Sequence, residues 1–559
     1  MKVAVIGGGA AGMMFSTQYK KANPDDEVFV FEKSQYVAWA GCPTPYYIAD
    51  ELSFNDVVLG TPEDFIKRGV NVKILHKVTN IDFKNKTLTV EGNEINGAFE
   101  YDRLIIAVGA KSFVPNIKGY SENLENVFTL SHAEHAVKIK EYINDNKDKI
   151  KKAVVVGAGF IGLETAEAFN RKGMEVTIVE KSDKIFPTVS ENLKSEIYES
   201  IEKHGIALKL NSGVNEIVSE NNIAKSVQLD NGESIDFDIA LFSIGITPNI
   251  DFISSELKTE NGKIVVNDKF ETNLPDVYAV GDCIFNKFYH TDRNLYAPFG
   301  DVANKHGMLL AKYLSGQNIS WKGLLRSFAT SFYDIKLAQT GLSLEEAQSL
   351  GYNAEKIEMR AMYKNSGFKD SFPIKTEIIY DKDKKYSCDL LIFLDSATRD
   401  RTGETGKNIE SKITINIDHH VSNPLYADIH CVITYSSSTS EIIYNFIKYM
   451  NYKFSLSVAE ALYLGLVNDT GNFSHSNVKV GTMQMATDLI AMGVNNNYIV
   501  TNFLNSNSYQ TLKMMGEALK NFIFYPEKKL SYYYLDHETM KKYNARKEDT
   551  EGIVEKILS

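Results

Sequence analysis

Two segments of the chain share the same succession of apolar and polar positions. Residues 2–7 form an apolar run that predicts a buried strand, and the glycine-rich stretch at 7–12 predicts a tight turn. Residues 13–21 predict a helix that leads to a second strand at 28–32. The same succession returns at 153–180, with the turn GAGFIG. We therefore expect two βαβ units.

Later apolar runs indicate how these units connect. Runs near 104–108, 240–244 and 277–280 are interpreted as further strands of the first sheet, which makes the second unit an insertion in the first domain. From 322 to 385, shorter alternating segments predict the opening of an antiparallel α+β domain. Beyond 386, two strands and three helices predict a further α/β unit.

Composition narrows the class of protein. A length of 559 residues predicts several domains, and a formal net charge of -11 argues against nucleic-acid binding. No secretory leader and no apolar run of about 20 residues is found, so we expect a cytoplasmic protein outside the membrane. The four cysteines are too few and too scattered for a disulfide framework, which suits a reducing compartment: Cys42, Cys283, Cys388 and Cys431.

The first turn has the spacing of a dinucleotide-binding site. Gly7, Gly9 and Gly12 form G-x-G-x-x-G, in which missing side chains let the backbone turn sharply and approach a pyrophosphate. Glu32 follows at the end of the next strand, where a carboxylate accepts hydrogen bonds from a ribose diol. This context predicts bound FAD or NAD.

The second turn repeats the arrangement. Gly157, Gly159 and Gly162 open it, and Glu180 ends the following strand. A carboxylate at this place repels a 2′-phosphate, which favours NADH over NADPH. The neighbouring Lys181 keeps NADPH open as an alternative.

Three further motifs complete a family pattern: YDRLIIAVGAKSFVPNIKG at 101–119, SIGITPN at 243–249 and DVYAVGDC at 276–283. With the glycine turns, residues 1 to about 385 resemble the pyridine nucleotide-disulfide oxidoreductases. The resemblance implies FAD at the first turn, a nicotinamide cofactor at the second, Asp282 on the ribityl chain, Glu164 near flavin and nicotinamide, and a homodimer. It adds these cofactor-binding residues: Ala10, Ala11, Lys33, Val78, Gly109, Ile161, Gly245 and Gly281.

The segment WAGCPTPYYIAD at 39–50 resembles the single-cysteine branch of that family. This branch contains coenzyme A disulfide reductases, persulfide or polysulfide reductases, and NADH oxidases and peroxidases. The resemblance implies that Cys42 is catalytic and cycles through a mixed disulfide, a persulfide or a sulfenic acid. Ala10 and Ala11 stand where oxidases and peroxidases usually carry a histidine, so disulfide or persulfide reduction ranks above oxygen or peroxide reduction, which stays the alternative.

The last third resembles the DHH phosphoesterases through LIFLDSATRDR at 391–401, INIDHHVSN at 415–423 and GLVNDTGNFSHSN at 465–477. The resemblance implies Asp395, His419 and Asp469 as metal ligands, usually for manganese. The family's earlier ligand motif and its closing glycine- and histidine-rich motif are not found. We therefore expect weak metal binding, with a phosphoesterase acting on short oligonucleotides or 3′-phosphoadenosine phosphate as the alternative function.

The predicted fold class is α/β, with two Rossmann-like domains, one inserted in the other, a truncated α+β interface domain and a partial α/β DHH domain. A natural fusion and a join between two neighbouring genes both fit the shortened modules. The expected domains are 1–115 with 245–320 for FAD, 116–244 for NAD(P), 321–385 for dimerisation, 386–520 for the partial DHH domain and 521–559 for the start of its associated domain.

Overall fold

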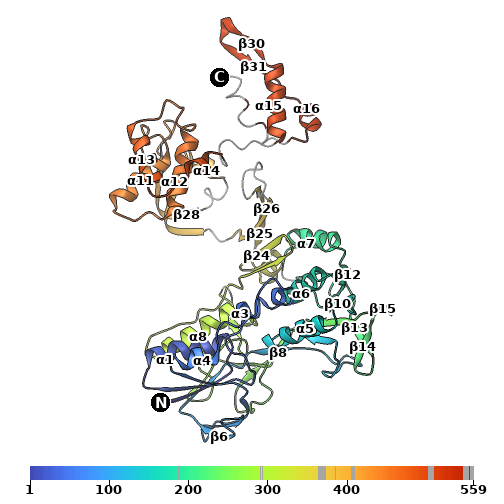
Figure 1. The fold of residues 1–559 in the computed structure, drawn as a ribbon. Coiled ribbons are helices and arrows are strands. Elements are labelled where there is room, and N and C mark those ends of the chain that lie inside the picture. The colour runs from blue at the N-terminus through green and yellow to red at the C-terminus, as the bar shows by residue number, and fades with distance from the viewer. Residues whose placement is uncertain are drawn as a thin grey trace. The chain divides into compact units, whose positions relative to one another are not determined.

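The computed structural model describes residues 1–186, 189–289, 291, 294–362, 373–383, 386–403, 409–501, 509–545, 550 and 553. The chain divides into two compact units, Met1–Glu346 and Ala347–Ser559 (Figure 1). None of the helices in the described ranges combines the length and apolar character that crossing a membrane requires.

The first unit begins with a parallel sheet in the order β20-β7-β1-β2-β3. Its central strand has no exposed apolar face, since Val3, Ala4 and Val5 are all fully buried. α1 and α8 pack against each other beside this sheet (Figure 1). The elements are β1 (Lys2–Ile6), α1 (Ala10–Ala22), β2 (Glu27–Phe31), β3 (Val70–Lys73), β7 (Arg103–Ile106), β20 (Val277–Ala279) and α8 (Gly300–Leu314).

A second parallel sheet has the order β12-β11-β10-β16-β9. The prediction that the run at 240–244 belongs to the first sheet is wrong, because β16 pairs with β10 and β9. Buried parallel strands are all apolar, so sequence pattern cannot tell which sheet a strand joins. The elements are β9 (Val127–Thr129), α5 (Ala133–Asp145), β10 (Lys152–Val156), α6 (Phe160–Arg171), β11 (Glu175–Val179), α7 (Glu191–Lys203), β12 (Ala207–Lys209) and β16 (Ile239–Phe242).

Short elements join the two sheets and extend their cores. The two strands that run between the sheets, β8 (Ala110–Ser112) and β17 (Ile246–Pro248), pair with each other. Antiparallel sheets are formed by β4 (Lys77–Asp82), β5 (Thr87–Glu91) and β6 (Gly97–Glu100), and by β13 (Val214–Glu220), β14 (Ile223–Leu229) and β15 (Ser234–Asp236). The remaining elements are α2 (Thr44–Ile48), α3 (Phe54–Val57), α4 (Pro62–Ile66), β18 (Thr259–Glu260), β19 (Lys263–Ile264), β21 (Asn286–Lys287) and β22 (Asn294–Leu295).

A hairpin closes the first unit. β23 (Phe328–Phe332) and β24 (Ile335–Gln339) pair in an antiparallel manner. Phe332 and Leu337 are buried in the same hydrophobic cluster as α5, α6 and the second sheet. The hairpin is therefore part of the first unit's core.

The second unit contains the antiparallel hairpin of β25 (Ala354–Met362) and β26 (Pro373–Asp381) and a parallel sheet in the order β27-β28-β29. The three helices predicted beyond 386 are found, and α11, α12 and α13 enclose a buried cluster around Tyr463 and Leu466. The elements are β27 (Tyr386–Leu394), β28 (Ile409–Asp418), β29 (Ile429–Val432), α11 (Thr439–Tyr449), α12 (Leu456–Asp469), α13 (Val480–Ala491) and α14 (Asn496–Ile499).

The end of the chain forms a separate small cluster around Met514 and Ala518. The elements there are α15 (Tyr509–Asn521), β30 (Ile523–Tyr525), β31 (Leu530–Tyr532) and α16 (His537–Lys542). The short helix α9 (Leu344–Ser349) spans the boundary between the two units in sequence. Much of the predicted 521–559 segment after 545 lies outside the described residues.

Candidate active site

The first glycine turn brings backbone segments into contact. Gly7 has a φ of +107°, and a Cβ there would lie 2.2 Å from the Ala107 carbonyl oxygen. A Cβ on Gly12 would lie 2.0 Å from the Gly7 carbonyl oxygen. At Gly9, by contrast, the nearest atom to such a Cβ is 4.0 Å away, so the turn leaves open space on this side. Tight packing beside open space is what a dinucleotide pyrophosphate needs.

A cavity of about 870 Å³ lies over this turn. Its volume is in the upper part of the range for ligand pockets, as a dinucleotide requires. Twelve predicted site residues line it: Gly7, Gly9, Ala10, Ala11, Glu32, Lys33, Cys42, Val78, Gly109, Ile161, Gly281 and Asp282.

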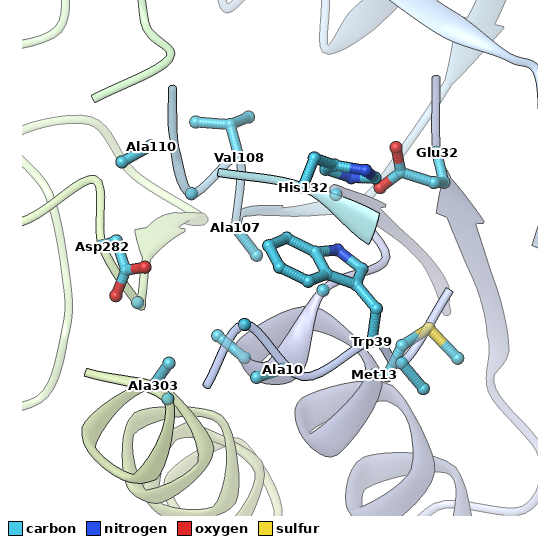
Figure 2. Close-up of a pocket in the computed structure, with 18 of the residues that line it drawn as sticks. Ala10, Met13, Glu32, Trp39, Ala107, Val108, Ala110, His132, Asp282 and Ala303 are labelled. Atoms are coloured by element: carbon cyan, nitrogen blue, oxygen red, sulfur yellow. The ribbon is translucent and has the colours of Figure 1, made fainter. Parts of the chain in front are cut away.

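Two buried carboxyl groups mark different sides of the cavity in Figure 2, Glu32 at the end of β2 and Asp282 after β20. Burial raises the pKa of Glu32, and it raises the pKa of Asp282 to about 6. Thr17 and His132 also line the cavity, and each keeps a buried polar atom without a hydrogen-bond partner in the described part of the chain. A polar ligand that bonds to these groups would offset the cost of burying them.

Trp39 and His132 are cavity residues that sequence reasoning missed. Their rings lie 4.5 Å apart between centroids, and Figure 2 shows them between Glu32 and Asp282. Burial lowers the pKa of His132 to about 4, so its ring is neutral near pH 7. Trp39 stands three positions before Cys42 and is one of two tryptophans, which is a weak sequence signal; His132 has none.

Cys42 lies just before α2 and is accessible in the cavity wall. Desolvation by the surrounding protein, and then the charge of Glu164, raise the pKa of its thiol. The other cysteine of the first unit, Cys283, is fully buried and donates to the Ile106 and Val280 carbonyl oxygens. Among the described residues that line the cavity, Cys42 is the single thiol.

Glu164 and Tyr46 are both held by the hairpin strand β23. Thr330 Oγ1 donates to Glu164 Oε1 at 2.7 Å, and Tyr46 Oη lies 2.6 Å from Ser331 Oγ. Burial raises the pKa of Glu164 to about 7, although the Thr330 bond opposes the rise. Glu164 is one helical turn after the cavity residue Ile161, and with this pKa it can take up or release a proton close to neutral pH.

The second glycine turn repeats the close packing of the first. A Cβ on Gly157 would lie 2.4 Å from the Ser243 carbonyl oxygen, and one on Gly162 would lie 2.0 Å from the Gly157 carbonyl oxygen. Glu180 follows β11 and accepts a hydrogen bond from the Ala158 N–H at 2.8 Å. The predicted residues that are not among those lining the cavity are Gly12, Gly157, Gly159, Gly162, Glu164, Glu180 and Gly245.

In the second unit, three predicted ligands converge. His419 Nε2 lies 3.6 Å from Asp395 Oδ1 and 3.7 Å from Asp469 Oδ2. Among the described residues, the ligand atoms of Asp395, His419 and His420 all lie within 4.8 Å of one another, a group that does not include Asp469. His420 Nδ1 also lies 2.7 Å from Asp418 Oδ1. Two ligand atoms that share one ion at about 2.1 Å are about 3–4 Å apart, so the distance from His419 to each carboxylate fits a shared ion.

Two dinucleotide-binding folds with one thiol in the cavity define a flavin- and pyridine-nucleotide-dependent oxidoreductase. The pyridine nucleotide-disulphide oxidoreductase family matches residues 1–304, more than half of the chain. The chain belongs to this family, and the predicted enzyme class is confirmed. The DHH family, N-terminal domain, matches residues 248–466, a range that includes Asp395 and His419 and ends before Asp469. The predicted combination of the two families is thereby confirmed.

Similar proteins carry different names. The chain is 32% identical over 398 residues to an NADH oxidase of Methanocaldococcus jannaschii, covering 69% of this chain and 86% of the relative. It is 33% identical over 358 residues to a coenzyme A disulfide reductase of Staphylococcus haemolyticus, covering 63% and 79%. The structure of a NAD-dependent persulfide reductase from A. fulgidus matches with a TM-score of 0.64 at 29% identity, covering 69% of this chain and 72% of that one.

Proposed function

We propose that the protein is a cytoplasmic reductase that uses FAD and NADH to reduce coenzyme A disulfide, a persulfide or polysulfide, or a similar small disulfide through Cys42. The observation that carries the proposal is the shared cavity: Cys42, the first glycine turn and Asp282 line one space, with no second thiol among the described lining residues. Relatives named for coenzyme A disulfide and persulfide reduction support it.

The residues fit the two cofactors. FAD would lie along the cavity, with Glu32 accepting from its ribose and Asp282 from its ribityl chain, and NADH would bind at the second turn with Glu180 accepting from its ribose. When bound, these groups supply hydride transfer from NADH and the electron pair that reduces the cysteine. The chain supplies orientation, desolvation and the thiol.

Cys42 carries out the exchange with the substrate. Its thiolate forms a bond to one sulfur of the substrate disulfide, and the other sulfur leaves as a thiolate. Glu164, whose charge acts on the Cys42 thiol and whose pKa burial raises to about 7, can supply a proton to this leaving thiolate. Two electrons then cleave the mixed disulfide, which returns the Cys42 thiolate and a second substrate thiolate. One NADH and one proton are consumed for two thiols released.

Several cavity residues bear on the acceptor. Ala10 and Ala11 line the cavity and offer no side-chain acid or base to oxygen or peroxide, which supports disulfide over oxygen reduction. Arg68 also lines the cavity and carries a positive charge, which suits a phosphate-bearing thiol such as coenzyme A. The alternative function is that of an NADH oxidase or peroxidase, in which oxygen or peroxide is the electron acceptor.

We also propose a homodimer formed through residues 321–385. On the β25–β26 hairpin, Ile357 pairs with Ile378, and these side chains are 39% and 45% exposed. Met359 and Ile374 extend the same apolar face. An exposed apolar sheet face of this kind supports contact with a second copy.

The test compares Cys42→Ser with Cys431→Ser, a control in the second unit. Both variants should bind flavin and lose its absorbance on anaerobic addition of NADH. Cys42→Ser should reduce turnover of coenzyme A disulfide by at least about a thousandfold, because the attacking thiolate is gone, whereas Cys431→Ser should retain it. Unchanged turnover in Cys42→Ser would refute the assignment.

A second, separate proposal is that the second unit binds one divalent cation, such as Mn²⁺, through Asp395, His419 and Asp469. Thr439 Oγ1 donates to Asp395 Oδ1 at 2.8 Å, which orients that carboxylate. Three ligands suit one ion bound weakly, and two-metal phosphoester hydrolysis requires more. We therefore expect binding without efficient phosphoesterase activity.

A further inference from the structure

The hairpin of β23 and β24 is bonded to successive turns of helix α6. Thr330 Oγ1 donates to Glu164 Oε1 at 2.7 Å, and the Tyr333 N–H donates to Glu167 Oε2 at 2.8 Å. The Tyr333 hydroxyl donates to Asn170 Oδ1 at 2.5 Å. Because residues three apart on a helix are neighbours on its surface, the three acceptors share one face of α6. The hairpin therefore holds this face at three places.

The same strand also holds the segment that carries Cys42. Tyr46 Oη lies 2.6 Å from the hydroxyl of Ser331, which follows Thr330 on β23. Tyr46 belongs to α2, which begins two residues after Cys42 and packs against α6. Adjacent residues of one strand thus bond to the helix of Glu164 and to the helix that follows Cys42.

The two bonds bring a carboxyl group, a thiol and a phenol into one electrostatic group. Burial raises the pKa of Cys42 and of Tyr46, and the charge of Glu164 raises both further. Burial also raises the pKa of Glu164 to about 7; the Thr330 bond opposes this rise, and the charge of Glu167 adds to it. The sequence of β23, FATSF, contains no ionisable side chain, so this strand presents hydroxyl groups to the carboxyl group.

We propose that Thr330 is a positioning residue for reduction of the substrate disulfide, because its hydroxyl fixes the Glu164 carboxyl group on the side of the Cys42 thiol. The proton moves from Glu164 to the sulfur that leaves the substrate, and water then reprotonates the carboxylate. Without the Thr330 bond the carboxyl group is free to rotate, and its ionised form loses a donor. The inference rests on the proposed function, in which Glu164 supplies this proton.

The first experiment measures kcat for coenzyme A disulfide between about pH 5 and about pH 10 with the full-length holoprotein. Since the protonated form of Glu164 is the acid, kcat of wild type should fall as pH rises through about 7. Thr330→Val should move this fall to higher pH by about one unit, as loss of one hydrogen bond to a charged group implies. It should also lower the maximal kcat by about threefold to tenfold, because the acid is no longer oriented.

Variants of the same hairpin provide the controls. Thr330→Ser retains the hydroxyl and should keep the wild-type pH profile, whereas Thr330→Ala removes it and should give the shift expected of Thr330→Val. Ser327 Oγ bonds within the hairpin, 2.8 Å from Thr340 Oγ1, so Ser327→Ala should keep the wild-type profile. A fall of kcat at the same pH in wild type, Thr330→Val and Thr330→Ala would overturn the inference.

A second experiment needs no disulfide substrate. The rate at which iodoacetamide alkylates Cys42 is measured against pH, and the modified peptide is quantified by mass spectrometry to separate it from the other cysteines. Because the charge of Glu164 disfavours the Cys42 thiolate, the rise of this rate with pH should slow where Glu164 ionises. We expect this point near pH 7 in wild type and about one unit higher in Thr330→Val.

The two experiments distinguish failure of the inference from failure of the proposed function. A holoprotein that reduces no disulfide but shows the shift in alkylation would refute the proposed function and support the positioning role of Thr330. Alkylation profiles that coincide in wild type and Thr330→Val would overturn the inference, whatever the turnover.

Discussion

Glu164→Gln should change the pH dependence of stability of the first unit. The carboxyl group lies on α6, mostly buried, and accepts its hydrogen bond from Thr330 Oγ1 at 2.7 Å. Burial raises its pKa from 4.5 to about 7. Between pH 4.5 and about 7 the folded state binds more protons than the unfolded state, so the free energy of unfolding falls as pH rises through this range.

The magnitude follows from the two pKa values. Each unit of pKa is equivalent to about 1.4 kcal/mol, so ionising Glu164 costs the folded state about 3 kcal/mol above pH 7. Glutamine keeps an oxygen to accept from Thr330 but has no charge to desolvate. The free energy of unfolding of Glu164→Gln, relative to that of wild type, should therefore increase by about 2–3 kcal/mol between pH 5 and pH 8.

Urea unfolding followed by tryptophan fluorescence measures this change, because Trp39 and Trp321 both lie in the first unit. Glu346→Gln is a control in which the pH dependence of stability should change in the opposite direction. Burial raises the pKa of Glu346, but the bonds from Arg326 and Ser343 outweigh it and the net pKa is lowered. That variant should lose stability relative to wild type as pH rises from 3 to 6. If the free energy of unfolding of Glu164→Gln differed from that of wild type by the same amount at pH 5 and pH 8, the reasoning would be refuted.

Further predictions concern cofactor, metal and assembly. Gly12→Ala should yield protein without bound flavin, seen as missing visible absorbance, because its Cβ would lie 2.0 Å from the Gly7 carbonyl oxygen; normal flavin content would contradict the close packing. Equilibrium dialysis should find one Mn²⁺ per chain that Asp469→Ala releases, and two ions per chain would contradict a single-ion site. Ile378→Glu should shift the sedimentation coefficient from dimer to monomer, since it places a charge on the exposed apolar face of the hairpin; an unchanged dimer would place the interface elsewhere.

The sequence by itself determined the two βαβ units and the three clustered motifs of the last third. Glycine spacing, an apolar strand and an acidic residue at the end of the next strand are local features of the sequence. At both places where they occur, from Gly7 to Glu32 and from Gly157 to Glu180, the structure contains a strand, a helix and a second strand. The helix after the first turn begins earlier than predicted, at Ala10, because Gly9 is its N-cap and Gly12 lies in its first turn.

Only the tertiary structure decided which sheet receives β16, that Trp39 and His132 share a cavity wall, and that Thr330 reaches Glu164 across 166 positions of the chain. These features depend on packing between distant segments, and the sequence of an apolar run or a single polar residue does not identify its distant partner. Local hydrogen bonding and periodicity are determined by neighbouring residues, whereas the pairing of strands and the surroundings of a side chain follow from the free energy of the whole fold.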